Sequence, residues 1–65
     1  MKLSKIDCYQ VITALRVMES EMQLGYLGYD IWVRLATFLD FPEDVIEGIE
    51  SKRLQARTDE IFELL

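Results

Sequence analysis

The sequence contains no histidine and, among its 65 residues, one cysteine, one proline and three glycines. Without histidine, the common nucleophile–base pairs are missing, and a single thiol cannot complete a zinc site. The one cysteine, Cys8, excludes an internal disulfide and fits a reducing compartment. Neither Gly25 nor Gly28 belongs to a phosphate loop, because no strand precedes them and no Lys-Ser/Thr pair follows. We therefore expect a protein that is not an enzyme and uses no cofactor or metal.

Basic residues are also scarce, because seven lysines and arginines stand against twelve acids, which gives a net charge of −5. Non-specific nucleic-acid binding depends on clustered basic residues, so we expect no direct nucleic-acid contact. No apolar run approaches the ~20 residues that cross a bilayer, and the charged start MKLSKID is not a secretory signal. We expect a soluble, cytoplasmic protein without membrane contact, encoded by a complete small open reading frame.

The length allows one domain, residues 1–65. A chain of this size buries only about 60% of the surface that its unfolded form exposes, and small domains without disulfides or metals often gain stability by oligomerising. Hydrophobic residues make up 51% of the sequence, which is ample for such a core. We expect the surplus to be covered by a second chain.

The apolar spacing predicts helices, with no period-two pattern for strands. A first helix over residues 4–24 begins at Ser4, with Asp7 as the acidic residue of its first turn. Gly25 is expected to end this helix in the left-handed conformation, and Gly28 to add a second flexible point. The apolar stripe of this helix consists of Cys8, Val11, Leu15, Met18 and Met22.

A second helix over residues 31–39, with Asp30 as its N-cap, is apolar around most of its circumference and should be the central one. Pro42 and the acids after it then predict a new helix start. Beyond Ser51 the apolar pattern changes phase, so residues 42–65 form either two helices or one long helix with two apolar faces.

These elements predict an all-α bundle of three or four helices, in which the first helix packs antiparallel on the second and a homodimer can complete the fold. The expected core residues are Val11, Leu15, Met18, Trp32, Leu35, Phe38, Leu39, Val45, Ile46 and Ile49.

Three groups of residues are candidates for binding a partner. The first is an acidic strip in which Glu43, Glu47 and Glu50 share one helix face; it is either an ordinary solvated face or an anionic surface for a basic groove. The second is the pair Tyr26 and Tyr29, because tyrosine is enriched among interface anchors. The third is an apolar face that the core does not need, formed by Leu54, Ile61, Phe62 and Leu65.

Residues 31–50, IWVRLATFLDFPEDVIEGIE, resemble the middle of a death domain, with a tryptophan, a Leu-Ala pair, a short break and an acidic stretch ending in Ile-Glu. A death domain needs more helices than this chain can hold. We therefore interpret the similarity as convergence on a helix–break–helix pattern.

The start Lys2-Leu3-Ser4, followed by the amphipathic segment 11–15, resembles small phage-encoded helical proteins. Anti-CRISPR proteins and other inhibitors of host functions belong to that class. The resemblance implies a short, acidic, non-catalytic accessory protein that acts in the cytoplasm of the host cell by occupying the surface of a host protein.

We therefore expect a small protein-binding inhibitor or adaptor. One alternative is an acidic mimic that blocks the nucleic-acid site of another protein, and a second is a structural subunit of a homo-oligomer. A weaker alternative is a DNA-binding helix-turn-helix, since Lys52, Arg53 and Arg57 form the one basic cluster, although acids surround it.

Overall fold

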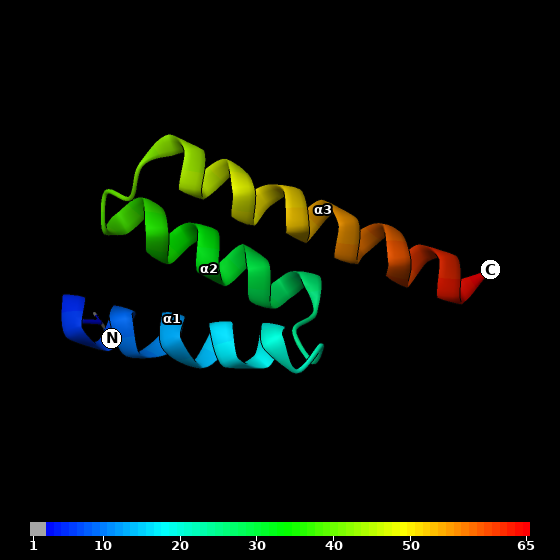
Figure 1. The fold of residues 1–65 in the computed structure, drawn as a ribbon, viewed down its shortest axis with the longest axis horizontal. Helices are drawn as coiled ribbons and strands as arrows, with labels where there is room; N and C mark the ends of the chain where they lie inside the picture. Colours follow the sequence, from blue (N-terminus) through cyan, green and yellow to red (C-terminus); the bar gives the residue numbers. More distant parts are fainter. Residues whose placement is uncertain (1–2) are drawn as a thin grey trace.

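The computed structural model describes residues 3–65, which form three helices: α1 (Lys5–Ser20), α2 (Tyr26–Phe38) and α3 (Glu43–Leu64). Figure 1 shows them side by side, each antiparallel to its neighbour in the chain, with α2 between α1 and α3. The all-α bundle is confirmed in its three-helix form, and the segment after Pro42 is a single long helix. Lys2, part of the quoted Lys-Leu-Ser start, lies outside the described residues.

The predicted start of α1 is confirmed by a reciprocal capping box. The Ser4 hydroxyl accepts from the Asp7 amide at 3.1 Å, and the Asp7 carboxylate accepts from the Ser4 amide at 3.2 Å. These two bonds satisfy amides that have no partner within the helix and set its first turn.

The ends of α1 and α2 share one C-terminal motif, and neither uses glycine. Met22 and Asp40 adopt the left-handed conformation, with φ of 58° and 57°. After each of them the next amide returns to a carbonyl five residues back, Gln23 to Met18 at 2.9 Å and Phe41 to Ala36 at 3.0 Å. This is the Schellman arrangement, which closes the last turn on both helices. The prediction that helix 1 runs to residue 24 is therefore wrong by one turn.

The connection between α1 and α2 differs from its prediction at both glycines. Gly25 has φ −80° and is the N-cap of α2, so it is not left-handed. Gly28 lies inside α2, where an added Cβ would meet Leu24 Cδ1 at 2.2 Å. Its role is close packing of Leu24 rather than a bend. Asp30 consequently lies within the helix and is not its N-cap.

The core forms mainly where α2 packs on α3. Tyr29, Val33 and Ala36 of α2 and Ile49 of α3 make one buried cluster, with Ala36 completely buried. The face of α1 that packs on α2 buries three further side chains, Cys8, Ile12 and Leu15.

Part of the predicted core list is wrong. Leu15 and Ile49 are buried as expected, and five others are partly buried, namely Val11, Trp32, Leu35, Leu39 and Ile46. Three are exposed instead, Met18, Phe38 and Val45, as is Met22 of the predicted stripe. A bundle of three helices covers a narrow arc of each helix, so side chains at the margin of the arc stay in contact with solvent.

None of the helices in residues 3–65 has the length and apolar character that a membrane span requires.

Two glycine-to-alanine substitutions test this packing. Gly48 lies in α3 with nothing within 4 Å of an added Cβ, so Gly48→Ala should raise the free energy of unfolding by roughly 0.5–1 kcal/mol through helix propensity. Gly28→Ala should lower it by about 1–3 kcal/mol, because Leu24 would be pushed off the core. Urea unfolding followed by circular dichroism measures both, and equal stabilisation by the two variants would contradict the packing role of Gly28.

Candidate binding surface

Helix α3 carries two different faces along its length. Its inner face packs on α2 through Ile46, Ile49 and Ala56. A second strip of residues lies roughly a third of a turn around the helix from this inner face. Its members are three, four or seven residues apart, so they lie on one side of the helix. The outer strip consists of Glu43, Glu47, Glu50, Leu54, Ile61 and Leu65. Most of the residues predicted to bind a partner therefore share one face, acidic in its first half and apolar in its second.

The apolar half of the outer strip extends onto the part of α3 that lies beyond the start of α2. In Figure 1 the last turns of α3 extend beyond the other two helices, and every residue from 57 to 65 is exposed. Ile61 is 51% exposed and Phe62 69% exposed, which are large values for such side chains. We call residues 57–65 the α3 extension.

The acidic half presents its charges to solvent. Glu43 and Glu47 are exposed and Glu50 is half-buried. The three ion pairs found within residues 3–65 involve none of these acids. Glu43 and Asp44 lie in the first turn of α3, where the positive end of the helix dipole favours them.

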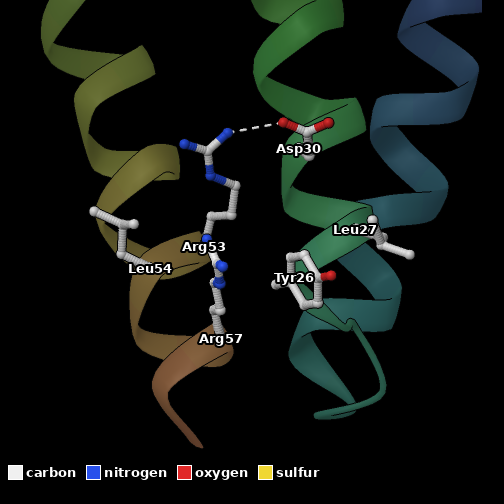
Figure 2. A pocket seen from close by; sticks show the side chains of 6 residues that line it. All are labelled: Tyr26, Leu27, Asp30, Arg53, Leu54 and Arg57. Atoms are coloured by element: carbon white, nitrogen blue, oxygen red, sulfur yellow. Dashed lines mark hydrogen bonds and ion pairs between the residues drawn. The ribbon is translucent and has the colours of Figure 1, made fainter. Parts of the chain in front are cut away.

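A groove of about 290 Å³ separates the start of α2 from the middle of α3. Figure 2 shows Leu27 and Leu54 on its two sides, with Tyr26 and the two arginines Arg53 and Arg57 between them. Leu27 is 64% exposed and Leu54 57% exposed. The structure thus brings Tyr26 and Leu54, two predicted binding residues from distant parts of the chain, to the same groove.

Tyr29, the other predicted tyrosine, points into the core and is 8% exposed. Its ring stacks on Trp32 with centroids 6.3 Å apart and planes 9° apart. Tyr26 and Tyr29, each preceded in the sequence by Leu-Gly, lie three residues apart in one helix, and Tyr29 takes the position that faces α3 and the core.

Two of the three residues of the basic cluster, Lys52 and Arg53, form ion pairs within the chain. Lys52 Nζ lies 2.6 Å from Glu19 Oε1, and Arg53 Nη1 donates to Asp30 Oδ1 at 2.8 Å. Arg57 has no ion pair within residues 3–65, so it is the one member of the cluster left to contact a partner. Sequence reasoning did not place Arg57 or Leu27 at the binding surface, because their proximity depends on how α2 packs against α3.

The Glu19–Lys52 pair lies beside Tyr29 and shifts the acid–base equilibria of its neighbours. The hydrogen bond to Glu19 raises the pKa of Lys52 above its ordinary value of 10.5. Burial, followed by the charge of Glu19, raises the pKa of Tyr29 above its ordinary value of 10.0. Both groups therefore stay protonated at neutral pH, and their role here is to tie α1 and α2 to α3.

Cys8 is 1% exposed in the core, where a thiol is usually inert. Across residues 3–65 there is no group of three His, Cys, Asp or Glu side chains placed to hold a metal ion. Comparison of the chain with protein families, with curated proteins and with solved structures found no match.

The Glu19 cluster predicts a loss of stability in alkali. The raised pKa values mean that the folded state holds these two protons more tightly than the unfolded chain does. Their contribution is complete below about pH 10 and is lost as the pH rises through the raised values. Urea unfolding should show the wild type losing more stability than Glu19→Gln between about pH 9 and about pH 11. Parallel losses in the two proteins would exclude Glu19 as the cause.

Proposed function

We propose that this protein is a small non-catalytic binding protein that acts by occupying the surface of another protein with the α3 extension. The observation that carries the proposal is the exposure of Ile61 and Phe62 on a stretch of helix with no other helix behind it. Contiguous exposed apolar side chains on a small domain typically mark a site of protein contact.

The arrangement suits a groove on the partner. Ile61, Phe62 and Leu65 occupy neighbouring positions on one side of the helix, with Leu54 two turns before them. An amphipathic helix with such anchors typically inserts its apolar side into a hydrophobic groove. The similarity of the chain's start to phage-encoded accessory proteins supports an inhibitor or adaptor of a host protein as the role.

A second candidate function uses the acidic half of the outer strip. Glu43 and Glu47 are exposed and have no ion pair within the described part of the chain, residues 3–65. Several carboxylates along one helix face can imitate a nucleic-acid backbone and block a basic site.

Photo-crosslinking in the native cell tests the first proposal. A photoreactive amino acid at position 62 should yield a discrete adduct heavier than two copies of the chain. Position 6 on α1 is the matched control, because Ile6 is 70% exposed and Phe62 69%. Identical adducts from both positions, no adduct from position 62, or adducts made only of two copies would contradict a foreign partner at the α3 extension.

With the crosslinked partner identified and purified, salt and charge reversal separate the two candidate functions. Binding through apolar anchors should change little with salt and weaken roughly tenfold or more on Phe62→Ala. Binding through the acidic strip should weaken steeply towards physiological salt, where charges are screened over ~8–10 Å. Reversal of Glu43 and Glu47 to lysine should abolish only the second mode, and isothermal titration measures both.

A further inference from the structure

Two opposite charges on α3 have no ion pair within residues 3–65 although they lie on the same side of the helix. Glu50 and Arg57 are seven residues apart, so two helical turns separate them by about 10 Å along the axis. They cannot reach each other within one chain. Between them on the same side is Leu54, with 57% of its surface exposed.

The α2 side of the groove adds a second exposed leucine, Leu27. Leu27 lies across the groove from Leu54, with Tyr26, Arg53 and Arg57 between them (Figure 2). The guanidinium of Arg53 is held by Asp30, so the free charge at the groove is that of Arg57. Along α3, the exposed Leu54 therefore lies between Glu50 and Arg57, one negative and one positive charge that have no ion pair within residues 3–65.

We infer that this region binds a second copy of the same chain, with the two α3 helices antiparallel and crossing at Leu54. In an antiparallel pair of helices related by a two-fold axis, each side of one helix lies against the same side of the other helix. Residues on the N-terminal side of the axis in one chain therefore contact residues on the C-terminal side in the other chain. Arg57 of each chain then faces Glu50 of the other. The two ion pairs then lie on either side of the two Leu54 side chains.

Charge complementarity is the reason to identify the occupant as a second copy. The pattern Glu50-x-x-x-Leu54-x-x-Arg57 has its acid before the leucine and its base after it, so it complements itself when one helix is reversed. Each chain carries a net charge of −5, so most orientations of two copies are repulsive. In the antiparallel crossing at Leu54, Arg57 of each chain lies against Glu50 of the other. These two attractive contacts favour this orientation of the two copies over the others.

Of the α3 extension, the dimer contact uses Arg57 and leaves Phe62, which lies outside the outer strip, available for a foreign partner. Ile61 and Phe62 lie about two turns beyond the crossing, and the antiparallel arrangement directs the two extensions to opposite ends. This inference therefore does not depend on the proposed binding of a host protein.

Sedimentation equilibrium at micromolar concentrations, with a charge swap, tests the inference. The wild type should be a dimer. Arg57→Glu alone or Glu50→Arg alone should raise the dimer dissociation constant by about tenfold or more, since each places like charges together twice. The double variant Arg57→Glu with Glu50→Arg restores both pairs in reversed polarity and should restore the dimer. Within a single chain these residues are too far apart for such a rescue.

The control variant is Glu21→Arg, which reverses an exposed acid at the C-terminal end of α1, away from the crossing, and should leave the dimer unchanged. Circular dichroism and thermal unfolding verify that each variant is folded, as expected for substitutions at residues outside the buried core. A monomeric wild type, insensitivity to either single reversal, or failure of the double variant to recover would each overturn the inference. A monomer would leave the crosslinking result at position 62 unaffected, so the two proposals fail separately.

Discussion

The contact between α2 and α3 around Ala36 and Ile49 determines the rest of the molecule. Ala36 is completely buried, so it lets the two helices pack closely, and the Asp30–Arg53 bond at 2.8 Å links the same helices further along. This packing decides which part of α3 lies over α2, where the groove opens beside Tyr26, and which turns of α3 have no helix behind them. The candidate surfaces therefore follow from two features. One is the position along α3 at which α2 packs, and the other is the difference in length between α2, with 13 residues, and α3, with 22.

The fold class and several local features were predictable because short-range rules control them. The Ser4 cap, the new helix after Pro42 and the two faces of α3 all follow from residue spacing and capping chemistry. The start of α2 was not predictable, because glycine at positions 25 and 28 is typical of a hinge. The structure uses Gly28 for close packing of Leu24, which depends on tertiary contacts. Likewise, Met22 adopts the left-handed conformation usually taken by glycine, which the residue type does not predict.

The candidate surface was predictable only in part. Periodicity alone places Leu54 and Ile61 on one side of a helix and separates them from Ile49. It cannot assign Tyr26 and Tyr29, because residues three apart differ by only about 60° around a helix, and the packing of the neighbouring helix decides which of the two is covered. It also cannot show that Asp30 holds Arg53 and Glu19 holds Lys52, which leaves Arg57 as the unpaired member of the basic cluster. Pairing between distant segments decides these assignments.

The length of α3 has a consequence for how tightly its extension can bind. The last turns of α3 extend beyond the other two helices, and most helical stability in proteins comes from tertiary packing rather than from propensity. A helix end without such packing tends to fray, so a partner that requires it to be helical must supply the free energy of ordering it. Affinity is then set partly by helix propensity at exposed positions of the extension, such as Thr58, whose hydroxyl donates to the Leu54 carbonyl of its own helix. Substitutions there to alanine could tighten binding without adding one contact, which would give the chain a means of adjusting its residence time on a partner independently of its specificity.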